Sequence, residues 1–294
     1  MFDLRYHVAS LAAVFLALVI GILVGVGIAS QTSVDESERR VLEEQIARLE
    51  RERDSRAAEA EQLRGQQLAA ATYIERTYPA LMEGRLRGVR VGLLFIGQAD
   101  TGLQAAVTQT LEDASAPGLV RMRALLLPVD AEAVTGPLEA DQTGALGLEE
   151  VGRRLGREFV NGGDTPLWDA LAEVLVEDNL GGSGEELDAI VVAHTARITN
   201  APTARFVSGL YAGIAGGGSP AIGIETMNAQ PSRIAVYRAG GLSTVDSVDT
   251  AVGRVALAEL LRGGPEGYYG VKSTAEDGAV PLLEPLPLAP VPGG

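Results

Sequence analysis

Residues 8–29 read VASLAAVFLALVIGILVGVGIA, a run without a charged side chain. An α-helix rises about 1.5 Å per residue, so this run is long enough to cross a hydrocarbon core roughly 30 Å thick. We therefore predict one transmembrane helix, a membrane anchor that includes Val8, Leu16, Gly21 and Gly25. The rest of the chain then lies on one side of the membrane.

The flanks of this helix predict its orientation. Asp3, Arg5 and His7 precede it beside the free amino group, whereas it is followed by Asp35, Glu36 and Glu38. Positive charge favours the cytoplasmic side, so residues 1–7 are predicted to be cytoplasmic and the chain after residue 29 extracytoplasmic.

Cleavage of the helix as a signal peptide is the alternative, because Gly27 and Ala29 are small residues that a signal peptidase accepts before Ser30. The apolar run exceeds the roughly 7–15 residues of a signal-peptide core, which favours an anchor that is retained. Gly21 and Gly25 also form a GxxxG pattern, which lets two such helices approach closely.

Residues 30–80 are predicted to form a coiled-coil stalk. From residue 35 to about residue 77 the chain lacks proline and contains one glycine, Gly65, in a run rich in Glu, Arg, Ala and Gln. Apolar residues recur at steps of four and three in a heptad seam that is broken by Arg53, Arg56 and Gln67; its apolar members are Leu42, Ile46, Leu49, Ala60, Leu63, Ala70 and Ile74. We predict a parallel homodimer through this seam; a single helix that folds back on the head is the alternative.

From Gly88 the pattern changes to short apolar runs bounded by Gly, Pro or Asp, which predict strands buried on both faces. The runs are residues 89–96, 124–127, 189–193, 221–224 and 234–237, and helical stretches alternate with them at roughly 102–115, 148–160, 166–178, 202–215 and 248–262. The alternation predicts a doubly wound, mainly parallel α/β (Rossmann-like) head over residues 88–272. Residues 273–294 are predicted to form a Pro-rich tail.

Composition limits the function classes. The chain has no cysteine, so it has no disulfide, thiolate metal site or cysteine nucleophile. The net charge of −15 argues against a nucleic-acid partner, because nucleic-acid binding needs clustered Lys and Arg. No metal site is identifiable and no cofactor is evident.

Candidate site residues lie where strands end, since ligands of open parallel sheets bind at the carboxyl ends of the strands. His194 ends the third predicted strand, and Asp246 and Asp249 share a loop before the last helix. These three are the candidates for a ligand or cofactor site. Each has a structural alternative: a buried histidine held by hydrogen bonds, or an Asp249 or Thr250 side chain that caps the last helix. No catalytic residue is predicted, because no serine has a nucleophile-elbow setting.

Two glycine-rich loops fit helix ends better than phosphate sites. GQADTG at residues 97–102 has neither the GxGxxG spacing nor a P-loop lysine, which favours a helix N-cap. AGGGSP at residues 215–220 follows a predicted helix, which favours a C-cap.

Two terminal segments resemble the mycobacterial copper transport protein B family. The N-terminal MFDLRYHVASLAAVFLALVIGILVGVGI is similar to the start of that family, and LSTVDSVDTAVGRVALAELLRGGPEGYYGVK at residues 242–272 is similar to its C-terminal segment. The resemblance implies copper transport at a bacterial cell membrane, described as an outer-membrane role in mycobacteria, and some relatives are linked to envelope and cell-separation control. Copper is implied by this resemblance alone, because the methionines are only Met1, Met82, Met122 and Met227, without paired spacing.

Three functions remain open on the sequence. The resemblance favours membrane-anchored copper efflux or homeostasis. The absence of a catalytic or metal constellation favours a non-enzymatic dimeric envelope scaffold, or a regulator of cell separation, that binds an envelope or cytoplasmic partner protein. An enzyme would follow only from the α/β head, and a fold alone does not establish an activity; we predict that the chain is not an enzyme.

Overall fold

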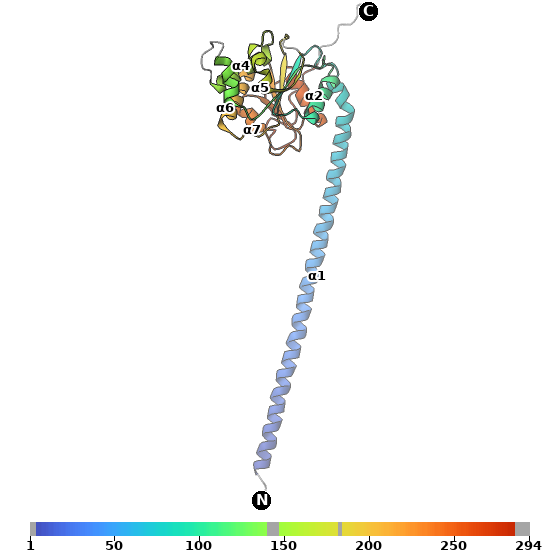
Figure 1. The fold of residues 1–294 in the computed structure, drawn as a ribbon. Coiled ribbons are helices and arrows are strands. Elements are labelled where there is room, and N and C mark those ends of the chain that lie inside the picture. Colours follow the sequence, from blue (N-terminus) through green and yellow to red (C-terminus); the bar gives the residue numbers. More distant parts are fainter. Residues whose placement is uncertain (1–3, 140–146, 182–183, 286–294) are drawn as a thin grey trace, which may run out of the picture. The chain divides into compact units, whose positions relative to one another are not determined.

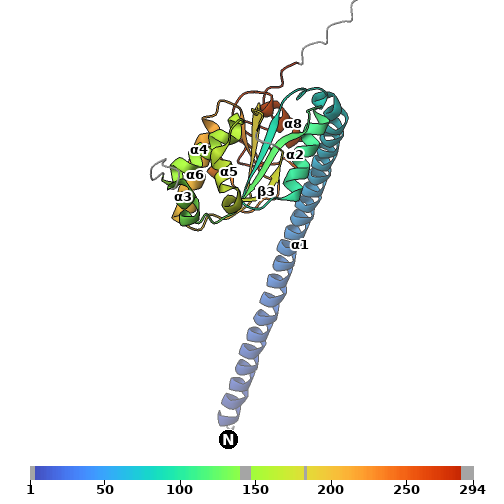
Figure 2. The same cartoon turned by 45° about the horizontal axis from the view of Figure 1, so that its top comes forward.

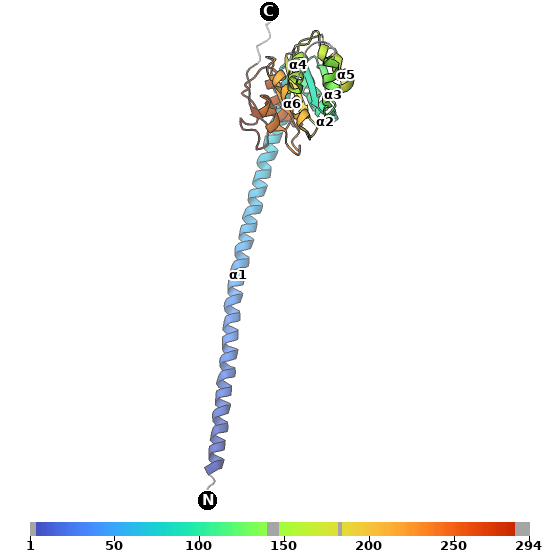
Figure 3. The ribbon, with the colours of Figure 1, turned by 60° about the vertical axis from the view of Figure 1, so that its left-hand side comes forward.

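The computed structural model describes residues 4–139, 147–181 and 184–285. The chain divides into two compact units, residues 1–71 and residues 72–294. Helix α1 (Leu4–Met82) is continuous over 79 residues (Figure 3), and its last turns belong to the second unit.

The first unit consists of α1 alone. Its apolar span, His7–Gly27, has a mean hydropathy of 2.7 and agrees with the predicted anchor to within two residues at either end. Further along the same helix, four residues of the predicted seam have 52–61% of their surface exposed: Leu42, Ile46, Leu49 and Leu63. Such an exposed apolar stripe is available to a second helix, and the coiled coil itself stays a prediction.

The second unit contains one seven-stranded sheet in the order β3-β2-β1-β4-β5-β6-β7. Figure 1 shows this sheet among the helices of the head. The strands are β1 (Val91–Ile96), β2 (Leu119–Leu125), β3 (Val176–Leu180), β4 (Ala189–His194), β5 (Ala221–Ile224), β6 (Ser243–Val245) and β7 (Tyr268–Tyr269). Six of them run parallel, and β3 pairs antiparallel with β2 at one edge. The predicted mixed α/β class with a parallel sheet is confirmed.

Helices cover both faces of this sheet (Figure 2). One face packs against α2 (Thr101–Asp113) and α8 (Ala251–Leu261). The other packs against α3 (Ala131–Glu139), α4 (Leu148–Asn161), α5 (Pro166–Leu175), α6 (Ala201–Ala215) and α7 (Ile234–Ala239). Alternate side chains of β1 enter the two cores, Leu93 on one side and Leu94 on the other, so its entire apolar run is buried.

The predicted strand at residues 234–237 is wrong, because these residues form α7. Ile234 and Tyr237 are both buried, and their spacing of three places them on one helical face. An apolar run of four residues fits a strand or a helix turn equally well. The strand of this region is β6, six residues later.

The segment between β2 and β4 is richer than predicted. It contains α3 and the antiparallel strand β3 besides α4 and α5, and the predicted helix at 166–178 ends at Leu175.

Strand β2 begins at Leu119, five residues before the predicted start at residue 124. The prediction missed its first part because two arginines interrupt the apolar pattern there. Arg121 and Arg123 are buried, and their guanidinium groups donate hydrogen bonds to main-chain carbonyls of Phe159, Glu185 and Leu180. Those bonds let charged residues occupy a buried strand.

Helices α4 and α6 pack backbone against backbone. A Cβ atom placed on Gly209 would lie 1.9 Å from the main-chain oxygen of Glu149, and one on Gly152 would lie 2.1 Å from that of Phe206. Gly156 and Gly213 make equally close approaches. Each helix therefore presents a GxxxG pair at the crossing, and any side chain there would push the helices apart.

The last turns of α1 are fixed within the second unit by polar contacts. Just after α1, Arg85 forms an ion pair with Glu259 of α8, and the two side chains are 5% and 1% exposed. Tyr78 donates to the Asp113 carboxylate and accepts a 3.0 Å hydrogen bond from the Arg254 guanidinium.

The structured head continues past the predicted boundary at residue 272. Thr274 bonds to Asp246, Glu276 pairs with Arg238, and Leu283 packs against the core. Contacts with the head continue as far as Glu284, which pairs with Arg262, and the predicted tail beyond residue 285 lies outside the described residues.

Candidate functional site

The predicted site residues lie at the carboxyl edge, which we define as the edge of the sheet where the parallel strands end. His194 is the last residue of β4 and is 6% exposed. Its Nδ1 lies 2.7 Å from the Tyr211 hydroxyl, and its main-chain N–H donates to the Tyr237 hydroxyl at 2.6 Å. Its Nε2 has no hydrogen-bond partner among the described residues. The ring is therefore enclosed by two tyrosines rather than open to a ligand.

Burial, together with the positive charge of Arg233, lowers the pKa of His194 to about 4. The unfolded chain takes up this proton near its ordinary pKa of 6.5, so below that pH only the unfolded state is stabilised by protonation. We expect the contribution of His194 to stability to be complete above about pH 6.5 and to fall by up to about 3 kcal/mol as the pH drops to about 4.

Urea unfolding followed by the fluorescence of Trp168, the sole tryptophan, measures this dependence across pH. The His194→Asn variant should lose stability less steeply than the wild type between about pH 6.5 and pH 4. Parallel pH profiles for the two proteins would contradict the assignment.

Glu225 directly follows β5 at the same edge and is 3% exposed. Its carboxylate accepts from the Ser232 hydroxyl, the Arg233 main-chain N–H and the Lys272 ammonium, at 2.9, 2.7 and 2.7 Å. Lys272 is the single lysine of the chain, and it also donates to the carbonyl of Thr226. This ion pair, of a buried carboxylate and a partly buried ammonium group, ties two loops together.

Asp246 follows β6 and is 1% exposed. Its carboxylate accepts from the Thr274 hydroxyl and from the main-chain N–H groups of Val271 and Lys272. Asp249 is exposed and accepts from the N–H of Met227 at 2.7 Å. Thr250, rather than Asp249, caps α8 by accepting from the N–H of Gly253. Both aspartates therefore hold loops in place.

We expect Asp246→Asn to destabilise the head by about 1–3 kcal/mol, because three donors lose their charged acceptor. Asp249→Asn is the matched control: it removes charge from an exposed residue that accepts one hydrogen bond, from the N–H of Met227, so its effect should be smaller. Trp168 fluorescence gives the stability, and hydrogen exchange of residues 270–276 reports the loop. Loss of cellular function with unchanged stability would instead mark a ligand site.

An open pocket lies at the same edge, near the switch point where β1 has β2 on one side and β4 on the other. Its volume is about 370 Å³, and it is lined by residues 97–100, 125–127 and 195–196. Asp100 accepts from the N–H of Leu103 and so caps α2, which confirms the predicted helix cap. A carboxylate at this helix terminus disfavours phosphate there.

The structure joins one apolar, membrane-length helix to a mainly parallel α/β head, which defines the class of the protein. The chain belongs to the family described as copper transport outer membrane protein, MctB, whose model matches residues 1–280. The copper transporters MctB of Mycobacterium bovis and of two strains of Mycobacterium tuberculosis are 27% identical to it over 92% of this chain and 96% of theirs. The predicted family is confirmed.

The described residues do not fit a resident copper site. Among them, no group of three or more His, Cys, Asp or Glu side chains is placed to hold a metal ion. Met82 and Met122 are buried in the core, and Met227 lies in a separate loop. Cuprous ion prefers thiolate and thioether ligands, and this head offers no paired set of them.

Sequence reasoning missed the residues that hold the carboxyl edge, namely Glu225, Lys272, Tyr211 and Tyr237. Two of them carried a usable signal: Glu225 ends an apolar strand, and Lys272 is a lone lysine in an arginine-rich chain. Their pairing across 47 residues follows only from the fold.

Proposed function

We propose that this chain is a membrane-anchored protein of copper efflux or homeostasis, with residues 1–7 in the cytoplasm and the head outside it. Membership of a copper transport family over residues 1–280 carries the proposal. The relatives named copper transporters align along nearly their whole length, with the N-terminal segment included in the family match.

The protein acts through assembly rather than as a pore by itself. A channel through a membrane needs several helices or a closed barrel, and the described residues contain one candidate span. The exposed seam on α1 and the open faces of Gly21 and Gly25 support a parallel homodimer. Copper then passes between copies of this chain or through another protein.

Gene deletion tests the copper role. Cells without the chain should accumulate copper, measured by elemental mass spectrometry, and should grow less well in added copper. The full chain should restore both, and a chain with an unrelated single-span helix in place of residues 8–29 tests whether the anchor is more than a tether. Unchanged copper content and tolerance in the deletion strain would remove the proposal.

The absence of cysteine allows a clean test of topology. We expect a membrane-impermeant maleimide to label Glu112→Cys, an exposed position on α2, in intact cells, and to label Phe2→Cys only after the cells are opened. Labelling in the reverse order would place the head in the cytoplasm.

A non-enzymatic envelope scaffold, or regulator of cell separation, is the second proposal. One observation favours it: the polar candidates His194, Asp246 and Asp249 are engaged by the chain's own groups. Crosslinking in cells followed by mass spectrometry should then recover a division or cell-wall protein. Recovery of contacts between copies alone would count against a scaffold.

A further inference from the structure

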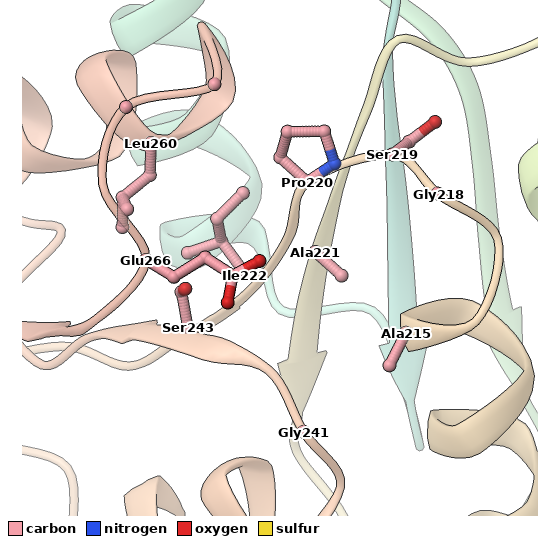
Figure 4. Close-up of a pocket in the computed structure, with 12 residues that line it drawn as sticks. Ala215, Gly218, Ser219, Pro220, Ala221, Ile222, Gly241, Ser243, Leu260 and Glu266 are labelled. Carbon is pink, nitrogen blue, oxygen red and sulfur yellow. The ribbon is translucent and has the colours of Figure 1, made fainter.

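A second pocket lies at the amino edge, the edge of the sheet where β5 and β6 begin. Its volume is about 290 Å³ (Figure 4). It is lined by the first residues of the two strands, Ala221 and Ser243, by the loop after α6 and by the end of α8 with the loop that follows. This edge is opposite to the one where parallel sheets usually bind ligands.

Glycines keep this pocket open. Gly218, Gly241 and Gly263 line it with φ angles of +86°, +79° and +91°, a left-handed conformation that side chains rarely adopt. A Cβ atom on Gly218 or Gly263 would meet nothing within 4 Å. The backbone turns therefore require residues without side chains, and the pocket stays unfilled as a result.

The charge of the lining is negative. Glu266 is its only ionisable residue, and its carboxylate has no hydrogen-bond or ion-pair partner within the described ranges. In Figure 4 its side chain points toward Ile222 and Ser243. Glu266 is exposed, so its carboxylate can be reached by a ligand that enters the pocket.

Two helix ends add to this negative charge. Ala215 ends the 15-residue α6, and Leu260 lies in the last turn of the 11-residue α8; both line the pocket. The C-terminus of a helix carries roughly half a negative elementary charge on its unpaired carbonyl groups. The loop at residues 215–220 follows a helix C-terminus, so it is unsuited to phosphate and suited to a cation.

The remaining lining selects an organic cation over a metal ion. Ala215, Pro220 and Ala221 give the lining accessible apolar surface, whereas a divalent metal needs several oxygen ligands and only one carboxylate is present. The volume lies just below the range of about 300–1,000 Å³ for drug-sized ligands, which fits a single side chain or a small amine.

We propose that the amino-edge pocket binds a guanidinium or alkylammonium group, with its charge on Glu266 and its carbon stem against Pro220 and Ala221. The source is an arginine or lysine side chain of a protein partner, or a small free amine. Both share the chemistry of a cationic head on an apolar stem.

Ligand-observed NMR titration of the full chain in phospholipid nanodiscs tests this assignment. The probes are N-acetyl-arginine methylamide for a peptide side chain, butylamine for a free amine and N-acetyl-citrulline methylamide as the uncharged match of arginine. At least one cationic probe should bind, and if the arginine probe binds, the citrulline probe should bind at least about tenfold more weakly, which corresponds to about 1.4 kcal/mol. Binding of the arginine probe alone identifies a guanidinium site, and binding of butylamine identifies a site for amines in general.

Glu266→Gln should weaken binding of the cationic probe by at least about tenfold. The position is exposed, so the variant should fold, and Trp168 fluorescence checks that it does. Glu112→Gln removes an exposed carboxylate on α2, outside the pocket, and should bind as the wild type does. Equal binding to wild type and Glu266→Gln, or no binding of either cationic probe, would overturn the proposal.

Discussion

Gly209→Ala is expected to destabilise the head by about 3 kcal/mol or more, the largest effect of any single methyl group that we foresee. The new Cβ would lie 1.9 Å from the main-chain oxygen of Glu149 in α4. Relief requires one helix to move, because a backbone atom cannot rotate away as a side chain can. Movement would open the contact at Gly152 and Gly213 as well, so dispersion contacts along the crossing are lost together.

Gly136→Ala is the matched control for this prediction. Gly136 lies within α3, and a Cβ there would meet nothing within 4 Å. The added methyl should stabilise the helix by about 0.5–1 kcal/mol, since alanine has less freedom to lose on folding. Urea unfolding followed by Trp168 reports both variants. Equal stability of Gly209→Ala and Gly136→Ala would show that the close crossing is not a constraint.

Glu259→Ala is expected to cost about 3–5 kcal/mol of folding stability. The Arg85 guanidinium would keep its buried position without its carboxylate, because its side chain is only 5% exposed. Main-chain oxygens of Leu81 and Glu284 would remain as acceptors, and they carry no full charge to balance the guanidinium. The cost is therefore that of an uncompensated buried charge.

A double replacement separates this cost from the worth of the ion pair. Arg85→Met combined with Glu259→Leu removes both charges and keeps apolar volume, and it should recover most of the stability lost in Glu259→Ala. If the double variant is as unstable as Glu259→Ala, the lost stability comes from packing at these two positions rather than from the unpaired charge. The same Trp168 assay applies to both.

The sequence predicts those elements whose residue pattern can be buried in only one kind of structure. The runs that became β1 and β4 are continuously apolar, and only a strand between two helical layers buries every residue of such a run. By contrast, β3 reads VEDNL, which is too polar for a buried strand. It forms as an antiparallel edge strand, where pairing with β2 outweighs its weak intrinsic preference.

The sequence predicts where the candidate site residues lie in the fold, but it does not predict which residues form hydrogen bonds with them. His194 and Asp246 lie at the carboxyl edge because strand ends must meet there. Their hydrogen bonds come from Tyr211 on α6 and Thr274 beyond β7, which lie far from them in sequence. The amino-edge pocket was not foreseen as a binding site, since its space depends on how three loops converge.

The continuity of α1 has a mechanical consequence for a dimer. Gly21 and Gly25 stand three heptads before Leu42 and Ile46, so a 3.5-residue period puts the glycine pair and the seam on one longitudinal line. In a dimer joined along that line, the same face of each helix would meet its partner both at the glycine pair in the membrane span and at the seam. With no hinge between them, torque applied at one end is conveyed to the other, and insertion of one residue after Gly25 would turn the two segments about 100° out of phase.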